Sequence, residues 1–345
     1  MPGPKKYFIQ EHLQREAFHG GIGNIDAEKV LVSLNYKAIE FPGYFDFSIK
    51  AKWQRFIHLF KTFVSVAAGD MVVFQFPLHA RIHILLVKLL RIKGIHIVCF
   101  ITDLEGLRVK DAAMLAKDKK ALRRFSLFIS HNARMSQWLR SQVPRANIAE
   151  IGFFDFLTTP VNRHRKKGPQ IVFAGNLQKS PFIQHLEQLT GFCPNITFLI
   201  YGPDYPAHLS FPKNAVYKGI FPPYDIVHHL EGSFGLVWDG PSIESCTGIF
   251  GEYLALNSPH KLSLYIMAGI PLIVPKMSAS AGMVEQYGIG CTIDRLADIE
   301  TVINTISDAA YETMVNNTRS LAADISRGKC LQQALHHLEK TLYEN

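Results

Sequence analysis

Short apolar runs alternate with longer amphipathic stretches along this chain. In the first half the apolar runs have the length of strands and lie at 7–10, 37–41, 72–77, 95–101, 127–132 and 148–153. The stretches between them predict helices ending near residue 34 and at 52–67, 80–93, 109–124 and 133–141. Repeated strand–helix units of this kind are typical of a parallel, doubly wound sheet.

A second series follows residues 158–169, which have proline at both flanks and no apolar periodicity. It predicts strands at 171–176, 196–203, 215–222, 234–238, 271–274 and 291–294, and helices near 181–189, 223–230 and 259–268 before the closing helices. A chain of 345 residues is also too long for one small core. We predict an α/β protein in which two Rossmann-like, doubly wound domains face each other across a cleft. The predicted parts are domains 1–157 and 170–328, a linker at 158–169, and a C-terminal helix at 329–345 that packs back toward the first domain.

The composition is that of a soluble globular protein, with 48% hydrophobic and 19% charged residues. No apolar run approaches the roughly 18 residues that a membrane-spanning helix needs. The chain reaches charged residues too early for a signal peptide. Its five cysteines lie far apart without a C-x-x-C motif, which is typical of reduced cytosolic thiols. We therefore predict a cytoplasmic protein.

Basic residues are concentrated in the first half of the chain. Residues 1–160 hold 23 Lys and Arg against 13 Asp and Glu, whereas residues 169–345 hold 10 against 16. The excess of basic residues in the N-terminal half indicates an anionic partner, which could be nucleic acid, a membrane surface or an acidic substrate.

The stretch from Phe234 to Pro275 predicts a strand, a loop, a helix and a second strand. Ser258 is a suitable N-cap, and Pro259 then takes the first helical position. Lys261 lies in the first turn of this helix, which starts at the carboxyl end of a strand. Free N–H groups, the helix dipole and a lysine predict an anion site, most plausibly for a diphosphate. The alternative is an ordinary sheet-packing helix with a solvated lysine.

Other polar and glycine residues follow neighbouring strands and are expected at the same sheet edge. Two lysines on either side of one crevice could stabilise a departing diphosphate without a metal ion, and the chain contains no Asp-x-Asp motif. The predicted donor-binding residues are Gly175, Asn176, Lys179, Tyr201, Gly202, Asp239, Ser258, His260 and Lys261.

Asp103 and Glu105 end a strand of the first half, where one carboxylate could act as a general base. Helix-capping and surface acids are the alternative. The loop of His19, Gly20, Gly21 and Gly23 could approach an acceptor or donor, or could be a simple glycine-rich turn. It does not complete the G-x-G-x-x-G fingerprint, because Asp26 stands where the third glycine would be. The P-loop, G-x-S-x-G and H-E-x-x-H motifs are absent as well.

Six stretches together resemble bacterial β-1,6-galactofuranosyltransferases of O-antigen synthesis and, more distantly, glucosyltransferases that extend GlcNAc on serine-rich adhesins. They are F-G-L-V-W-D-G, E-S-C-T-G-I-F-G-E-Y-L, N-S-P-H-K-L-S-L-Y-I-M-A-G-I-P-L-I-V, I-T-D-L-E-G-L-R, I-S-H-N and F-A-G-N-L. The similarity covers most of the chain from about residue 70.

This resemblance implies a GT-B fold, a UDP-sugar donor, an inverting reaction, and neither a metal nor another cofactor. Lys261 matches the diphosphate lysine of the family, and Lys179 stands where the adhesin enzymes have a UDP-binding arginine. Relatives carry I-H-D where this chain has I-T-D, which leaves Asp103 as the base. Glu244 and Glu252 have the E-x₇-E spacing of many retaining GT-B enzymes. They lie 12 residues out of register with the glycine turn at 269, so we reject a retaining assignment.

We therefore predict an inverting transferase that moves galactofuranose from UDP-galactofuranose to a saccharide acceptor, carried on a lipid, in surface polysaccharide synthesis. The expected partners are the UDP-sugar, the acceptor and an anionic membrane surface, with no nucleic acid; a homo-oligomer is allowed. Another UDP-hexose transferase, such as a glucosyltransferase, is an alternative. So are a non-catalytic nucleotide-sugar-binding module and a nucleotide-dependent oxidoreductase, although the broken glycine fingerprint disfavours the latter.

The expected membrane contact is the basic stretch 108–125, at the inner face of the cell membrane. The stretch is predicted to be helical, so Lys110, Lys117 and Arg124, which are seven residues apart, share a face that Lys120 joins. Its apolar flank would be Met114, Ala121 and Phe125. Basic amphipathic helices adsorb to anionic lipid, and the alternative is a sheet-covering helix with a solvated basic face.

Overall fold

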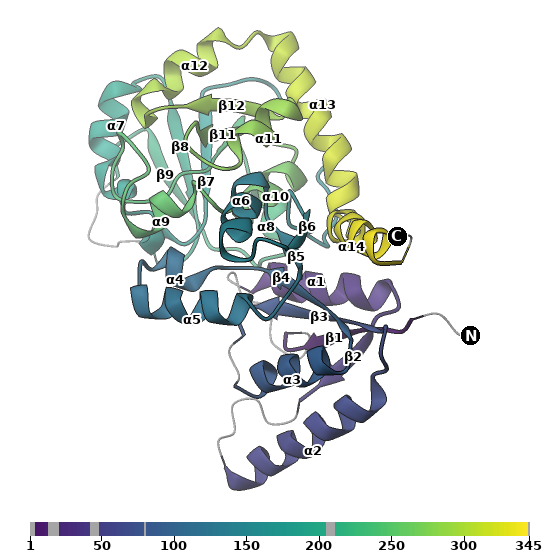
Figure 1. Cartoon of the computed structure of the whole chain (residues 1–345). Helices are drawn as coiled ribbons and strands as arrows, with labels where there is room; N and C mark the ends of the chain where they lie inside the picture. Colours follow the sequence, from purple (N-terminus) through teal and green to yellow (C-terminus); the bar gives the residue numbers. More distant parts are fainter. Residues whose placement is uncertain (1–3, 13–20, 42–47, 79–80, 205–210, 344–345) are drawn as a thin grey trace. The chain divides into compact units, whose positions relative to one another are not determined.

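The structure is a computed structural model that describes residues 4–12, 21–41, 48–78, 81–204 and 211–343. The chain divides into two compact units, each with its own parallel sheet (Figure 1). Unit 1 comprises Met1–Ile151 and Leu331–Asn345, and unit 2 comprises Gly152–Cys330. The predicted α/β class with two doubly wound sheets is confirmed.

Unit 1 is built on six parallel strands in the order β2-β1-β3-β4-β5-β6. β3, at the middle of the sheet, is buried along its whole length, as expected of a parallel strand covered on both faces. The strand order reverses between β1 and β3, which makes their carboxyl ends the topological switch point of this unit. The strands are β1 Lys6–Gln10, β2 Lys37–Glu40, β3 Met71–Phe76, β4 His96–Ile101, β5 Leu127–Ser130 and β6 Asn147–Glu150.

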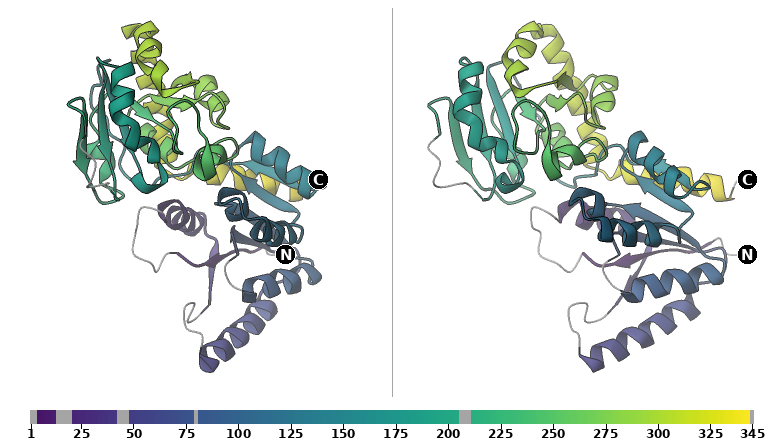
Figure 2. Two further views of the ribbon diagram at one scale, coloured as in Figure 1. Left: turned by 90° about the vertical axis from the view of Figure 1, so that its left-hand side faces the viewer. Right: turned by 60° about the vertical axis from the view of Figure 1, so that its left-hand side comes forward.

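Helices connect these strands, and the last helix of the chain returns to the same unit. In this helix Glu339 accepts a hydrogen bond from the Tyr36 hydroxyl at 2.6 Å and pairs with the Lys6 ammonium at 2.7 Å. α2 lies beside α3 on the side away from the sheet (Figures 1 and 2). The helices are α1 Ile22–Ser33, α2 Ile49–Ser65, α3 Arg81–Ile92, α4 Glu105–Arg108, α5 Ala112–Leu122, α6 Ala133–Gln142 and α14 Lys329–Tyr343.

The helix predicted at 109–124 is present but shorter, because α5 spans only Ala112–Leu122. A short α4 ends at Arg108, Lys110 has a left-handed φ of 54°, and Asp111 then caps α5 by accepting a hydrogen bond from the Met114 N–H. Lys110 and Arg124 therefore lie outside α5, so they do not share one helical face with Lys117.

The predicted apolar flank of this stretch is wrong as well. Ala121 and Phe125 are buried, and the Phe125 ring packs edge-on against Phe74 of β3. α5 therefore turns its apolar side to the core of unit 1 and presents its lysines to solvent.

Unit 2 is built on a second set of six parallel strands, in the order β12-β11-β10-β7-β8-β9. The strand order reverses between β7 and β10. The strands are β7 Gln170–Ala174, β8 Thr197–Tyr201, β9 Ala215–Gly219, β10 Phe234–Leu236, β11 Leu272–Pro275 and β12 Gly290–Ile293. The helices are η1 Leu177–Lys179, η2 Pro181–His185, α7 Leu186–Phe192, α8 Ile226–His229, α9 Gly248–Tyr253, α10 Lys261–Met267, α11 Ala281–Gln286, η3 Leu296–Asp298, α12 Ile299–Thr305 and α13 Asp308–Ile325.

Residues 152–169 form neither helix nor strand, but they are fixed to unit 2 by side-chain contacts. Phe153, Phe154 and Phe156 are buried. The Arg165 guanidinium donates to the carbonyl of Ala268 at 2.7 Å and to that of Leu230 at 3.1 Å. Burial lowers its pKa to about 10, which leaves the guanidinium charged at neutral pH.

The Tyr265 hydroxyl joins the two strands at the switch point of unit 2. It accepts a hydrogen bond from the Ala174 N–H of β7 at 2.8 Å and donates one to the Leu236 carbonyl of β10 at 3.0 Å. Its ring lies against Gly235, where an added Cβ would stand 2.4 Å from the ring carbon Cγ. Gly235 is therefore needed because a tyrosine ring fills the space beside it.

We predict that Gly235→Ala destabilises the protein by about 1–3 kcal/mol, the usual cost of overpacking a core. The clash is with a ring that two hydrogen bonds hold in place. Gly191→Ala in α7 is the matched control, because its new methyl group would meet no atom within 4 Å. This control should be stabilised by about 0.4–1 kcal/mol. Urea unfolding of the two variants and the wild type measures both effects, and equal stabilities for Gly235→Ala and the wild type would contradict the prediction.

Candidate functional site

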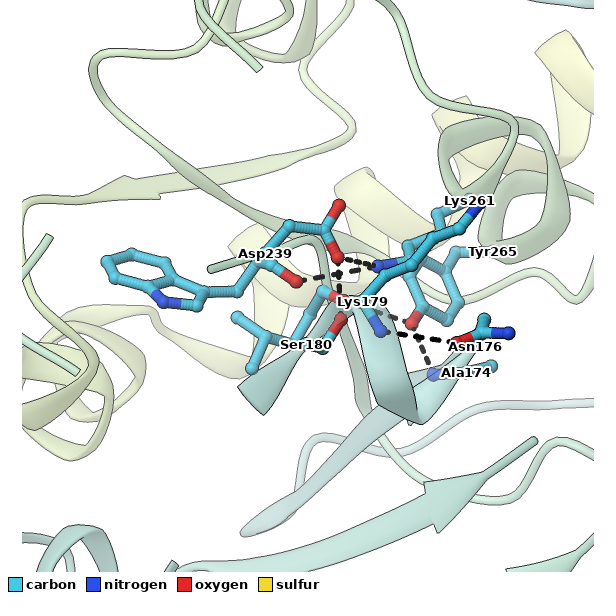
Figure 3. A network of polar contacts seen from close by, with 9 residues as sticks. Ala174, Asn176, Lys179, Ser180, Asp239, Lys261 and Tyr265 are labelled. Atoms are coloured by element: carbon cyan, nitrogen blue, oxygen red, sulfur yellow. Dashed lines mark hydrogen bonds and ion pairs between the residues drawn. The ribbon is translucent and has the colours of Figure 1, made fainter. Parts of the chain in front are cut away.

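The candidate site of unit 2 lies at the carboxyl ends of β7 and β10, where the strand order reverses. Open α/β sheets bind ligands at such a switch point, because the chain leaves the two strands in opposite directions. Gly175, Asn176 and Lys179 follow β7, and Asp239 follows β10. Lys261 enters the same space as the first residue of α10 (Figure 3).

An ion pair forms the centre of this site. The Lys261 ammonium lies 2.6 Å from Asp239 Oδ1, and their side chains are only 15% and 14% exposed. The buried Ser180 hydroxyl donates to the same carboxylate oxygen at 2.6 Å (Figure 3). The ammonium also lies 4.5 Å from the centre of the Phe173 ring, a cation–π distance. These contacts fix one positive charge in a largely desolvated position.

Two glycines allow the backbone to approach this lysine. A Cβ atom on Gly175 would stand 2.7 Å from Lys261 Cε. Gly202, directly after β8, has a φ of +132° and lies so close to Gly175 that an added Cβ would be 1.9 Å from the Gly175 carbonyl oxygen. Both positions were predicted as donor-binding residues, and the structure places Gly175 beside Lys261 and Gly202 against the Gly175 backbone.

The second predicted lysine lies on the turn after β7. Asn176 caps this turn by accepting a hydrogen bond from the Lys179 N–H at 3.2 Å, and it donates to the Asp204 carboxylate at 2.6 Å. The Lys179 side chain is exposed, with its ammonium 5.6 Å from the centre of the Phe250 ring. Beside this turn lies a pocket of about 220 Å³, lined by Leu177, Gln178, Pro181, Ile183, Gln184 and Asp204.

Three predicted donor residues are placed differently from what the sequence suggested. The helix begins at Lys261, so Ser258 is not its N-cap; Ser258 is buried three residues earlier. The His260 ring packs 4.9 Å from the ring of Phe156. The Tyr201 hydroxyl is held by the backbone at His229 and Glu231, away from the ion pair.

Because α10 has only seven residues and a small dipole, an anion at this site would be attracted mainly by the charge of Lys261.

Sequence reasoning missed two side chains that organise the site, Ser180 and Tyr265. Ser180 stands directly after Lys179 in the turn and could have been noticed as a neighbour. Tyr265 lies one helical turn after Lys261, on the same face of α10. No sequence signal showed that its hydroxyl would bridge two strands.

In unit 1, Asp103 follows β4, as predicted, whereas Glu105 is the first residue of the short helix α4, which was not predicted. Arg108 joins them: its Nε lies 2.8 Å from Asp103 Oδ2, and its Nη2 lies 3.6 Å from Glu105 Oε1. Asp103 Oδ1 also accepts a hydrogen bond from the Leu104 N–H at 2.9 Å. The two carboxylates are thus oriented at one edge of the sheet, with side chains 29% and 33% exposed.

The predicted glycine loop is described only in part. His19 and Gly20 lie outside the described residues. Gly21 is the N-cap position of α1, and Gly23 lies in the first turn of that helix. Beyond this position, nothing in the structure links the two glycines to a ligand.

A buried acid at the switch point of unit 1 was also missed. Glu28 of α1 accepts hydrogen bonds from the N–H groups of Glu11 at 2.8 Å and His12 at 3.0 Å, just after β1. Gln75 of β3 donates to the same carboxylate at 3.3 Å. The sequence shows Glu28 only as a charged residue in an otherwise ordinary helix.

His131 directly follows β5 and is fully buried, with its ring beside the end of β4. Its Nε2 donates to the Ile101 carbonyl at 3.0 Å, because a carbonyl can only accept. Burial lowers the pKa of His131 to about 4, so the imidazole is neutral at pH 7.

Within the described residues, no group of three or more His, Cys, Asp or Glu side chains could hold a metal ion. The expectation of a metal-free reaction stays a prediction. Across the same residues, no helix is both long and apolar enough to cross a membrane.

Two family models match the chain. The N-terminal domain described as glucosyltransferase 3-like matches residues 6–148, and the corresponding C-terminal domain matches residues 171–338. The chain is 28% identical to the β-1,6-galactofuranosyltransferase WbbI of Escherichia coli K12 over 278 residues, which cover 78% of this chain and 79% of that protein. The resemblance read from the sequence is confirmed.

Solved structures with the same fold cover nearly the whole chain. Sucrose-phosphate synthase from Thermosynechococcus elongatus superimposes with a TM-score of 0.66 at 13% identity, covering 99% of each chain. Anabaena HepE in complex with UDP gives a TM-score of 0.60 at 12% identity, covering 99% of this chain and 100% of that one. These likenesses confirm the predicted GT-B fold.

We predict that the wild type loses stability as the pH falls from 7.5 to 5.0 because of His131. The unfolded histidine, with its ordinary pKa near 6.5, binds a proton in this range, whereas the folded one stays neutral down to about 4. The loss attributable to His131 is about 2 kcal/mol at pH 5. In His131→Gln the side-chain amide can still donate to the Ile101 carbonyl, but the variant has no imidazole at this position to take up a proton on unfolding. Denaturant unfolding at both pH values should give a smaller pH effect for the variant, and parallel pH dependences would rule the explanation out.

Proposed function

Because the chain belongs to the glucosyltransferase 3-like family and is a glycosyltransferase, we propose that it transfers galactofuranose from UDP-galactofuranose to a saccharide acceptor with inversion. The observation that carries the proposal is the ion pair of Lys261 and Asp239 at the switch point of unit 2. Similarity to WbbI, a β-1,6-galactofuranosyltransferase, supports the choice of sugar.

The diphosphate of the donor binds at Lys261 in this proposal. An ammonium group has three donors, so Lys261 can keep Asp239 and still bind a phosphate oxygen. The Gly175 backbone lies beside the lysine and lets a phosphate come close. As the bond to the sugar breaks, charge develops on the departing UDP, and the fixed cation stabilises it. HepE, which shares the fold, was solved in complex with UDP.

Lys179 provides a second positive charge for the same ligand. Its exposed side chain lies on the turn that Asn176 caps, so it can move toward a bound diphosphate at the cost only of its contact with the Phe250 ring. Two cations approaching from different elements suit a leaving group that carries two phosphates.

Asp103 acts as the general base that takes the proton from the acceptor hydroxyl. Its carboxylate is oriented by Arg108 and by the Leu104 N–H, and it is partly exposed, so an acceptor can reach it. The deprotonated oxygen then attacks the anomeric carbon on the face opposite UDP, which inverts the configuration.

A retaining role for the E-x₇-E pair is not favoured by the surroundings of these acids. The Glu244 carboxylate is 53% exposed and lies 3.7 Å from the Arg295 guanidinium, and Glu252 is exposed on α9. We place neither residue at the reacting carbon. The remaining partners in this proposal are a lipid-linked acceptor and the anionic membrane surface that carries it.

We predict that Lys261→Ala weakens UDP binding by about 1.5–3 kcal/mol, the usual value of a charge-assisted hydrogen bond. Part of the loss arises because Asp239 is left without its cation and repels the diphosphate. The double variant Lys261→Ala/Asp239→Asn should therefore recover some affinity. Lys179→Ala should act in the same direction, and Lys276→Ala, at a lysine 67% exposed, is the control. Calorimetry with UDP measures all four, and unchanged affinity in both lysine variants would remove the diphosphate assignment.

We predict that Asp103→Asn lowers turnover by roughly 10²-fold or more and leaves UDP affinity unchanged, because it removes the base alone. Glu105→Gln, its neighbour on the same arginine, is the matched variant and should retain most activity. Turnover is followed with UDP-galactofuranose and UDP-glucose, and NMR reports the anomeric configuration of the product.

A β-galactofuranoside formed from the α-linked donor would support the proposal. Preference for UDP-glucose would make the enzyme a glucosyltransferase, and an α-product would exclude inversion. UDP binding without turnover on any acceptor would favour the non-catalytic module.

A further inference from the structure

Helix α2 of unit 1 presents its apolar side to solvent. Of its 17 residues only Ala51, Leu59 and Thr62 are buried. Ile49 is 86% exposed, and Trp53 and Phe60 are each 65% exposed. The exposed apolar side chains of this helix, here called the α2 stripe, are Ile49, Trp53, Phe56, Ile57, Phe60 and Val64.

The α2 stripe is continuous along the helix. Its members follow one another at intervals of three and four residues, with one adjacent pair, so they fall on a single face. The rings of Trp53 and Phe56 stack with their centroids 5.9 Å apart. The buried residues Ala51 and Thr62 lie on the opposite face, the one turned to the protein. A surface helix normally turns its apolar face to the core, and α2 does the reverse.

Basic residues accompany the α2 stripe, and the helix contains no Asp or Glu. At 100° per residue, Lys50 and Lys61 fall along one border of the stripe and Lys52 along the other. Lysine side chains at such borders can extend their ammonium groups toward phosphate headgroups while the stem covers apolar surface. Aromatic and aliphatic residues on one face with lysines beside them are typical of helices that lie in a membrane interface.

The helix is held in this orientation by its neighbour α3. The Lys93 ammonium, just after α3, donates to the Phe63 carbonyl and lies 4.8 Å from the centre of the Phe63 ring. At the end of α3, Ile92 is 83% exposed. The stripe is therefore presented by a packed element of unit 1.

We propose that α2 docks unit 1 on an anionic phospholipid bilayer, with the α2 stripe inserted among the headgroups and its lysines on lipid phosphates. A second copy of the chain is the competing occupant. In a two-fold symmetric pair the same surface would face itself, and two helices with four basic residues each and no acid would repel one another. An anionic bilayer satisfies both the apolar face and the charge.

This assignment differs from the one drawn from the sequence, which placed the membrane contact at 108–125. There the apolar residues Ala121 and Phe125 are buried, and the exposed residues of α5 are lysines and small alanines, without a large apolar side chain. Attraction by charge alone is screened by salt. Insertion of tryptophan and phenylalanine adds a contribution that salt does not remove.

The test is co-sedimentation with vesicles of phosphatidylglycerol and phosphatidylcholine, compared with pure phosphatidylcholine, at low and high salt. The aromatic variant, Trp53→Ser/Phe56→Ser/Phe60→Ser, should bind the anionic vesicles at least about tenfold more weakly, since each buried aromatic side chain contributes strongly to insertion. The charge variant, Lys50→Glu/Lys52→Glu/Lys61→Glu, should lose binding to a similar extent at low salt. The control variant on α5, Lys117→Glu/Lys120→Glu, should bind like the wild type.

Tryptophan fluorescence provides a second measurement. Of the three tryptophans, Trp238 is fully buried, Trp138 is half-buried and Trp53 is 65% exposed. A blue shift on adding anionic vesicles should therefore come mainly from Trp53 and should disappear in Trp53→Phe, which keeps an apolar ring. Circular dichroism confirms that each variant is folded.

The proposal would be overturned if the aromatic variant pelleted with anionic vesicles as much as the wild type does. It would also be overturned if the wild type bound pure phosphatidylcholine vesicles as strongly as anionic ones. Loss of binding in the α5 control alone would overturn it as well. Light scattering that shows a wild-type dimer and a monomeric aromatic variant, with vesicle binding unchanged, would assign the stripe to a second copy.

Discussion

The arrangement of unit 2 depends on the hydrogen bonds of one hydroxyl group, that of Tyr265. At a switch point two parallel strands separate, and their last backbone groups lose the partners that a continuous sheet would supply. The hydroxyl satisfies both, accepting from Ala174 and donating to Leu236. Burial raises the pKa of this phenol, so it remains a donor at physiological pH. Gly235 follows from the same contact, because only a residue without a side chain leaves room for the ring.

The charge at the centre of the site follows from the same helix, since Lys261 and Tyr265 lie one turn apart on α10. An ammonium that is mostly removed from water needs a partner, and Asp239 supplies it at 2.6 Å. The ion pair therefore keeps the lysine in place before any ligand binds. In the proposed function a diphosphate then adds a second anionic partner to a cation whose position is already fixed, so little reorganisation is needed.

Unit 1 contains two basic helices whose apolar sides point in opposite directions. In α5 the apolar residues Ala121 and Leu122 are buried, and just after the helix Phe125 packs against Phe74 and Phe128, so the lysines of α5 remain at the surface. In α2 the small contacts at Ala51 and Thr62 face the protein, and the large aromatic residues remain outside. The α2 sequence is the more strongly amphipathic of the two, and only this helix leaves large apolar side chains exposed for a membrane. The proposed bilayer contact depends on this difference in orientation.

The sequence by itself determined the α/β class, the parallel sheets and most element positions, because these follow from local periodicity and turn residues. It also determined that Gly175, Lys179, Asp239 and Lys261 would gather at one edge, since parallel strands bring their carboxyl ends together. Only the tertiary structure decided that Ser180 and Tyr265 complete the site and that Tyr201 turns away from it. It also decided where the helix predicted at 109–124 begins and ends, and which way α2 faces. Side-chain direction and helix rotation are set by packing between distant segments, which local sequence does not encode.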